Sequence, residues 1–344
     1  MHPRFAWFAL LVACLMSAGS ARAADRISVA VGGKGITAYL PLTLAEDLGY
    51  FKEAGLAVEV SDLAGGAKMA EALVGGSADI GVGSYEHVLH LRPKGLDVIC
   101  ITLFNHTYGA VVGLPPQRAA TYRAPRDLKG LRIGVIAPGS SMDVALQLLL
   151  AKDGLSRDDV SVLGIGAGPS AIAAMKSGRL DGIVHADPII SRLVQDGDIV
   201  PVVDTRTEAG LTYLYNGFFA GSAVLTTESY AKAHPDLVQA FTTQIIRAFR
   251  YTKTAPMDEL MSHVPPEYYG ADKAIYAQRL AKDRASPGVL TTDGRVTLDA
   301  ARTTLRDLAT FDPVLKGKES AFDLPASFDN RFVEQANAAL GPDR

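Results

Sequence analysis

Residues 58–82, VEVSDLAGGAKMAEALVGGSADIGV, recur in part 102 positions later as residues 160–184, VSVLGIGAGPSAIAAMKSGRLDGIV. In both stretches a run with β-branched residues leads into a glycine-rich turn, an alanine-rich segment, a Gly-x-x-Asp motif and a second apolar run. Each copy therefore predicts a strand, a loop, a helix and a strand. Two such units predict two similar α/β lobes, and a cleft between lobes with glycine loops favours ligand binding.

The segments around the two copies continue the alternation of strands and helices. In the first lobe a helix with Pro41 near its start ends at Gly49, and Ser84 is well placed to cap a helix that runs to about residue 91. The other elements expected in the first lobe are strands at residues 27–31, 58–61, 79–82 and 98–104 and a helix at 67–74. Those expected in the second lobe are strands at 132–136, 160–163, 183–184 and 199–203 and helices at 141–152 and 171–176. This order is typical of parallel sheets.

The last third of the chain is mainly helical in pattern. After a strand at residues 218–226, helices are expected at residues 227–233, 235–251, 257–263, 268–283 and 297–309. Such a tail most simply packs on the first lobe. The chain then crosses between lobes near residues 104–112 and 215–222, and two extended crossings suit a hinge. The expected first lobe is residues 24–108 and 219–344, and the second is residues 109–218.

The first 23 residues have the order of a secretory signal peptide. Arg4 precedes an apolar stretch, residues 5–16, that is too short to span a bilayer, and Ala21-Arg22-Ala23 fits a cleavage site. We therefore expect cleavage near Ala23 and export to the periplasm. Residues 11–14 also match a lipoprotein processing site at Cys14, but that reading leaves an unusually short apolar region.

Composition narrows the function classes. Without residues 1–23 the chain has 32 basic and 37 acidic side chains, a formal net charge of −5, which gives no support to nucleic-acid binding. No other stretch is apolar enough for a membrane helix, so we expect the mature protein to be soluble. We also expect it to be a monomer. Cys100 is then the single cysteine, which excludes an internal disulfide.

Motifs for chemistry are missing from the sequence. The seven histidines lack metal-ligand spacing, and no G-x-S-x-G nucleophile motif occurs, so we expect no metal site, no cofactor and no enzymatic activity. Gly164, Gly166 and Gly168 start a dinucleotide-like pattern, but Pro169 occupies its last glycine position. The chain is therefore expected to bind a small molecule without converting it.

The strongest candidate for ligand contact is the loop that contains Gly139, Ser140, Ser141 and Met142, between a strand and a helix. Backbone N–H groups at a helix start are unpaired and can hold an anion, and the two hydroxyls add donors. The alternative is that one serine only caps the helix. Both can hold, because there are two serines.

Further candidates lie on loops that follow other predicted strands. Glycines would let a ligand approach the backbone, and aromatic rings could stack on a flat ligand. Polar side chains could form hydrogen bonds with the polar groups at its edge. These candidates are Lys34, Thr37, Tyr39, Gly65, Gly66, Ser84, Tyr85, His106, Gly168, His185, Asp187 and Asn216. For each of them a turn, a cap or core packing is the structural alternative.

Three segments resemble a known family. The first runs from Leu40-Pro41-Leu42 to Gly49-Tyr50-Phe51-Lys52-Glu53-Ala54-Gly55-Leu56, the second combines Asp127-Leu128-Lys129-Gly130 with Pro138-Gly139-Ser140 and residues 174–181, and the third begins at His234-Pro235-Asp236-Leu237-Val238. In this order they resemble periplasmic solute-binding proteins of the nitrate, sulfonate and taurine group of ABC importers. The resemblance implies the type II periplasmic-binding-protein fold, a two-lobed receptor that closes on a small molecule and presents it to a membrane permease. Enzymes that make the thiamine pyrimidine share this fold, but they resemble one another through a cysteine-rich motif that this chain lacks.

The sequence leaves the ligand and its use open. The helix start and serines favour a small organic anion, such as a sulfonate or an aromatic carboxylate, whereas Glu86, Asp143 and Asp187 also allow a ligand with an amino or ring N–H group. The alternatives to a transport receptor are an exported enzyme or pyrimidine-precursor binder on the same scaffold, and a ligand sensor for a membrane signalling protein.

Overall fold

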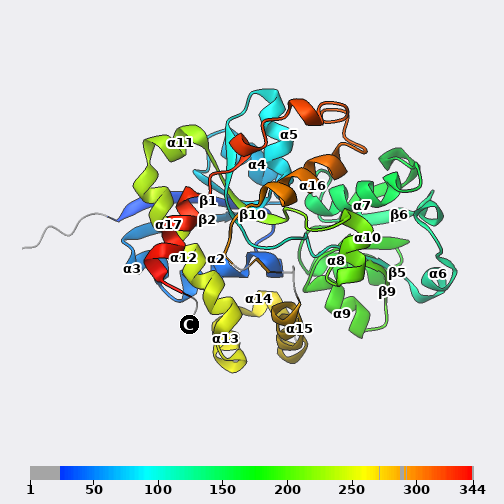
Figure 1. Cartoon of the computed structure of the whole chain (residues 1–344). Coiled ribbons are helices and arrows are strands. Elements are labelled where there is room, and N and C mark those ends of the chain that lie inside the picture. Colours follow the sequence, from blue (N-terminus) through cyan, green and yellow to red (C-terminus); the bar gives the residue numbers. More distant parts are fainter. Residues whose placement is uncertain (1–23, 271, 287–289, 292, 343–344) are drawn as a thin grey trace, which may run out of the picture.

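The computed structural model describes residues 24–270, 272–286, 290–291 and 293–342, so the expected signal peptide, with Cys14, lies outside the described residues. Two five-stranded sheets form, and Figure 1 shows them as two lobes, with the second lobe in green on the right. The α/β class and the two-lobed architecture are confirmed. None of the described helices has the length and apolar character needed to cross a membrane.

The first sheet has the strand order β2-β1-β3-β10-β4. Its strands are β1 (Asp25–Val31), β2 (Leu56–Asp62), β3 (Ile80–Ser84), β4 (Val98–Leu103) and β10 (Ser222–Thr227). β1 pairs in parallel with β2 and β3, whereas β10 runs antiparallel to β3 and β4. A strand from late in the chain thus lies between strands from its beginning.

The second sheet repeats this plan with the order β7-β6-β8-β5-β9. Its strands are β5 (Val111–Leu114), β6 (Arg132–Val135), β7 (Ser161–Gly164), β8 (Gly182–His185) and β9 (Val200–Asp204). β6 is parallel to β7 and β8, and β5 is antiparallel to β8 and β9. The expected parallel pairing holds for β1, β2 and β3 and for β6, β7 and β8. It does not hold for β5 and β10, which each enter their sheet directly from the other lobe and run in the opposite direction.

The helices cover the sheets and form the tail. In the first lobe they are α2 (Leu40–Asp47), α3 (Tyr50–Glu53), α4 (Gly66–Val74) and α5 (Glu86–Leu91). In the second they are α6 (Pro116–Thr121), α7 (Ser141–Ala151), α8 (Pro169–Lys176), α9 (Ile189–Gln195) and α10 (Glu208–Tyr215). After β10 come α11 (Glu228–Ala233), α12 (Pro235–Thr254), α13 (Met257–His263), α14 (Pro266–Tyr269), α15 (Lys273–Ala285), α16 (Leu298–Leu308) and α17 (Arg331–Leu340).

The repeat explains the equivalence of the two sheets. β2, α4 and β3 come from the first copy, and β7, α8 and β8 come from the second. Each copy places its helix between two strands that flank the same central strand, β1 or β6. The helices α10 and α17 were not expected, because each is a short segment that tertiary packing stabilises.

Ser84 does not cap α5, contrary to the prediction. Tyr85 is the residue that precedes the first turn, and its side chain makes no capping hydrogen bond. Ser84 is instead the last residue of β3 and is fully buried. Its hydroxyl is therefore free to make a contact outside the helix.

The two crossings between the lobes run side by side. The backbone N–H groups of Phe219 and Gly221 donate to the carbonyl oxygens of His106 and Asn105, at 3.2 Å in both cases. A Cβ atom on Gly221 would lie 2.2 Å from the carbonyl oxygen of Thr107, so a residue with a side chain would push the crossings apart. The pair of crossings is therefore a double connection between the two lobes.

The tail packs on the first lobe and also reaches the second. α12 lies against α2 and α17, and α16 packs against α5. α16 also contacts α7 and α10 of the second lobe, and α15 contacts α9. Figure 1 shows α15 below the space between the two lobes. The tail therefore contributes both to the stability of the first lobe and to the contact between the two lobes.

Candidate ligand-binding site

The lobes meet at the loops that follow β1, β3, β6 and β8. The side chain of Ser140 approaches Gly65, and a Cβ atom on Gly33 would lie 2.9 Å from the Cβ of Ala167. The backbone N–H of Thr37 also donates to the carbonyl oxygen of Asp187 at 3.2 Å. These contacts join the two lobes, so the structure is a closed form of the cleft.

A small cavity lies at the centre of this contact, and we call it the central cavity. Its empty volume is about 310 Å³, of which about 10 Å³ can hold the centre of a water molecule, roughly the space for a single water. It is lined by Gly32, Ile36, Tyr39, Gly66, Ser84, Tyr108, Ile136, Ser140, Ser141, Met142 and Ser222. Predicted site residues from both lobes thus come together here.

A chain of hydrogen bonds crosses the central cavity from one lobe to the other. The Oγ atoms of Ser84 and Ser141 are 2.7 Å apart, and the Ser141 hydroxyl donates to Oε1 of Glu86 at 2.7 Å. Ser84 and Glu86 flank the end of β3 in the first lobe, whereas Ser141 begins α7 in the second. Closure therefore gives the buried Glu86 a partner from the opposite lobe.

Ser140 has the role of a helix cap. Its Oγ accepts from the backbone N–H of Asp143 at 3.4 Å, and this is the side-chain cap of α7. The Asp143 carboxylate accepts from the backbone N–H of Gly139 at 2.8 Å and is held by Arg157 at 3.2 Å. The start of α7 thus already has an acidic group within its own first turn.

Aromatic side chains form the floor behind the central cavity. The ring centroids of Tyr108 and Phe219 are 5.0 Å apart, and those of Tyr215 and Phe219 are 4.4 Å apart. Burial raises the pKa of the Tyr108 hydroxyl well above its usual value, and the nearby Glu86 raises it further. Burial likewise raises the pKa of Tyr39, while a hydrogen bond with Ser84 opposes that rise.

A second cavity, the side cavity, lies next to the first and contains charged residues from both lobes. Its empty volume is about 670 Å³, and Thr37, Asp187, Arg206 and Asp283 are among its lining residues. Arg206 pairs with Asp187 at 2.7 Å within the second lobe. Arg279 on α15 bonds Asp283 and lies 3.4 Å from Oδ2 of Asp187. An ion-pair network thus connects the lobes.

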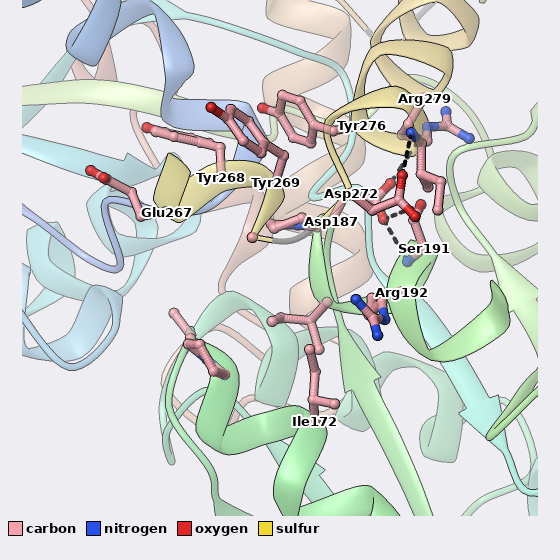
Figure 2. Close-up of a pocket in the computed structure, with 18 of the residues that line it drawn as sticks. Ile172, Asp187, Ser191, Arg192, Glu267, Tyr268, Tyr269, Asp272, Tyr276 and Arg279 are labelled. Atoms are coloured by element: carbon pink, nitrogen blue, oxygen red, sulfur yellow. Dashed lines mark hydrogen bonds and ion pairs between the residues drawn. The ribbon is translucent and has the colours of Figure 1, made fainter. Parts of the chain in front are cut away.

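Farther out, α14 and α15 face α8 and α9 across an outer groove with an empty volume of about 1150 Å³. Figure 2 shows Tyr268, Tyr269 and Tyr276 on one side of the groove and Ile172 on the other. Lys34 and Gly168 also line this groove, and the Lys34 ammonium pairs with Glu46 at 2.9 Å. Lys34 therefore lies away from the central cavity with its charge already compensated.

The remaining sequence candidates have structural partners. The Tyr85 hydroxyl bonds the Ser327 hydroxyl at 2.5 Å, and both ring nitrogens of His185 lie within 3.1 Å of backbone carbonyl oxygens. His106 packs on the ring of Phe218, and burial lowers its pKa. Asn216 ends α10 in a left-handed conformation, with its amide 3.5 Å from Asp307. None of these four side chains lines the central cavity.

Some lining residues were not among the sequence candidates. Ile36 and Ile136 follow strands as expected, but they are apolar and carry no chemical signal. Ser222 was missed because it begins β10, and the rule that ligand residues follow strands considers only carboxyl ends. Its pairing with Ser84 in the antiparallel ladder brings the amino end of β10 to the same edge.

Residues 36–259 match the protein family described as NMT1/THI5 like. The chain belongs to this family. A solved structure from Bordetella bronchiseptica RB50 is 38% identical and covers 92% of this chain and 98% of its own, with a TM-score of 0.86. The alkanesulfonate-binding protein SsuA from Xanthomonas axonopodis pv. citri, bound to MOPS, is 20% identical over 91% of this chain and 97% of its own, with a TM-score of 0.66.

A curated member of similar sequence is an enzyme. The 4-amino-5-hydroxymethyl-2-methylpyrimidine phosphate synthase of Aspergillus parasiticus is 24% identical over 243 residues, which are 67% of this chain and 68% of that protein. The fold expected from the resemblance is confirmed, because solved periplasmic binding proteins for alkanesulfonate and nitrate share it with this chain. Family membership alone does not separate binding from catalysis, so function rests on the site.

Proposed function

We propose that this protein is a periplasmic solute receptor of an ABC importer. It binds one small molecule between its two lobes, closes about the paired crossings and presents the molecule to a membrane permease. In this proposal residues 1–23 direct export and are removed near Ala23, and the receptor works as a monomer. The fold shared with periplasmic binding proteins supports this proposal.

The observation that carries the proposal is the contact between Ser84 and Ser141 across the central cavity. The two serines lie on loops of different lobes and surround an enclosed space with aromatic and apolar walls. In this closed form the space holds about one water, so a small molecule bound there must keep the two serines farther apart, which couples its binding to the shape of the whole molecule. A permease can distinguish the two shapes.

Binding without conversion fits the chemistry of the cavity. The lining residues include four serines but no histidine or lysine, and the carboxylate that accepts from Ser141, that of Glu86, lies behind the serine and is fully buried. Among the described residues, no group of three or more metal-binding side chains occurs. We therefore propose that the ligand leaves the protein unchanged.

Protein isolated directly from the periplasm should carry its ligand, and native mass spectrometry should detect the added mass. Adding the released compound at a hundredfold excess over Kd should stabilise the emptied protein by about 2.7 kcal/mol. A chemically altered compound would favour the enzyme alternative. The proposal fails if no compound copurifies and none from a broad panel of anions, amines and aromatics changes the melting temperature. Cross-linking in cells would then separate a permease partner from a signalling partner.

A further inference from the structure

Glu86 places an incompletely paired carboxylate beside the central cavity. Its side chain is 0% exposed, Oε1 accepts from Ser141, and Oε2 has no hydrogen-bond partner. The nearest basic group is the His87 ring, 3.6 Å away, but burial lowers the pKa of His87 and favours its neutral form. A buried carboxylate without a cation is costly, and such a group in a binding cleft indicates where a ligand supplies the partner.

The hydroxyl protons of Ser84 and Ser141 form a short chain that ends at Glu86. Ser141 has one hydroxyl proton and donates it to Glu86, so the short contact with Ser84 must use the proton of Ser84. Ser141 then presents lone pairs to any further group, whereas Ser84 also interacts with the Tyr39 hydroxyl. The cavity edge at Ser141 therefore accepts hydrogen bonds and does not donate them.

Several of the groups that could attract an anion already have partners. The start of α7 holds Asp143, Ser140 caps that helix, and Lys34 pairs with Glu46 in the outer groove. The lining of the central cavity contains no lysine or arginine. A carboxylate or sulfonate there would face Glu86 without a compensating cation.

Opening the lobes exposes this acceptor edge to an arriving ligand. The hydrogen-bond partner of Glu86 Oε1 in the closed form belongs to the second lobe, so Oε1 loses this partner when the lobes separate, and Oε2 has none in either case. The Tyr108 hydroxyl lines the cavity beside Glu86 and is 2% exposed. Apolar contact from Ile36, Ile136 and Met142 can hold the rest of the molecule.

We infer, resting on the proposed receptor function, that the ligand is a compound whose ammonium, amidine or N–H-bearing ring binds at Glu86, and not a simple organic anion. Glu86 is then the residue that determines specificity for charge. The apolar walls select a compact, partly apolar body.

The test uses three probes of nearly equal shape: benzamidine, benzamide and benzoate. Calorimetry with the emptied full-length mature protein should give an affinity for benzamidine at least tenfold higher than for benzoate, with benzamide between them. Glu86→Gln should lose at least tenfold for benzamidine and nothing for benzoate. Glu228→Gln is the matched control, because Glu228 begins α11, pairs with Arg92 and does not line the central cavity, so its loss should leave all three affinities unchanged.

The compound that copurifies with the protein gives a second test, which needs neither a variant nor the three probes. It should contain an amine, amidine or ring N–H group; an acid without such a donor would overturn the inference while leaving the receptor proposal intact. The inference would also be overturned, and the receptor proposal left intact, if the wild-type protein bound benzoate as tightly as benzamidine. If Glu86→Gln fails to fold, Glu86→Asp keeps the charge and should keep the preference for benzamidine. Failure of the receptor proposal looks different, because nothing would then copurify or bind.

Discussion

Ser140 and Ser141 are neighbours in the chain but serve different purposes. Ser140 lies in an extended conformation before α7, and its oxygen accepts from a backbone N–H of the first turn. Ser141 is the first residue of the helix, and its side chain turns toward the other lobe. One serine stabilises a secondary structure element, whereas the other stabilises the closed form.

Alanine at each position should separate these two roles. Ser140→Ala should lower the free energy of unfolding by about 1 kcal/mol, because α7 loses its cap. Ser141→Ala should change it less, because an opened protein can hydrate Glu86, but hydrogen exchange at residues 84–86 and 138–141 should become faster. Urea unfolding and deuterium uptake measure the two effects. If hydrogen exchange became faster by the same amount in Ser140→Ala and Ser141→Ala, the assignment of separate roles to the two serines would be wrong.

At the scale of elements, the contact of α16 with α10 contains a buried acid. Asp307 is 3% exposed, and its closest partners are Asn216 at 3.5 Å and Arg306 at 3.4 Å. Burial raises the pKa of Asp307 to about 6, against the opposing influence of Arg306 and Asn216. The tail therefore meets the second lobe through a group that is costly to ionise.

The pH dependence of this contact has a defined sign. Between about pH 4 and 6 the folded protein keeps a proton that the unfolded chain has lost, so this group makes stability fall as pH rises through that window. Asp307→Asn should stabilise the protein at pH 7.5 by on the order of 2 kcal/mol, and the gain should vanish below pH 4. Thermal unfolding of both proteins from pH 3.5 to 8 measures the difference. A gain that is independent of pH would exclude ionisation of Asp307 as its cause.

At the scale of the whole molecule, the two lobes are held together at two places of different chemistry. The serine contact closes the central cavity, and the network of Asp187, Arg206, Arg279 and Asp283 joins α15 to the second lobe. Because α15 belongs to the tail, the helices that follow the last strand in the chain help to determine the balance between open and closed forms. Such a balance determines how much binding energy closure consumes.

Removing the charge of Arg279 should shift this balance toward the open form. Arg279→Ala leaves Asp283 and part of Asp187 without a cation, so the ligand-free protein should have a larger radius of gyration in small-angle scattering. Arg192→Ala is the control, because Arg192 forms its ion pair with Asp196 at the end of α9 and only a longer-range attraction to Asp272 of the tail. An unchanged radius for Arg279→Ala, or an equal increase for Arg192→Ala, would show that the network does not hold the lobes closed.

The sequence by itself determined the elements and their duplication. Apolar periodicity, Pro41, Gly49 and the repeated Gly-x-x-Asp motifs are local signals, and the elements that they predict form within a few residues of the expected bounds. Loops after strands also indicated Ser84, Ser140 and Ser141 as neighbours of a cleft. These inferences succeeded because they depend on short-range steric and hydrogen-bonding preferences.

Only the tertiary structure decided the direction of β5 and β10, the use of each serine and the charge beside the cavity. Strand direction depends on where the crossings enter each sheet, and no local pattern encodes that. Ser141 meets Glu86 across 55 residues, so the fate of its hydroxyl proton depends on lobe closure. The sequence therefore predicted a binding cleft, whereas the packing of the two lobes determined which hydrogen-bonding groups that cleft presents.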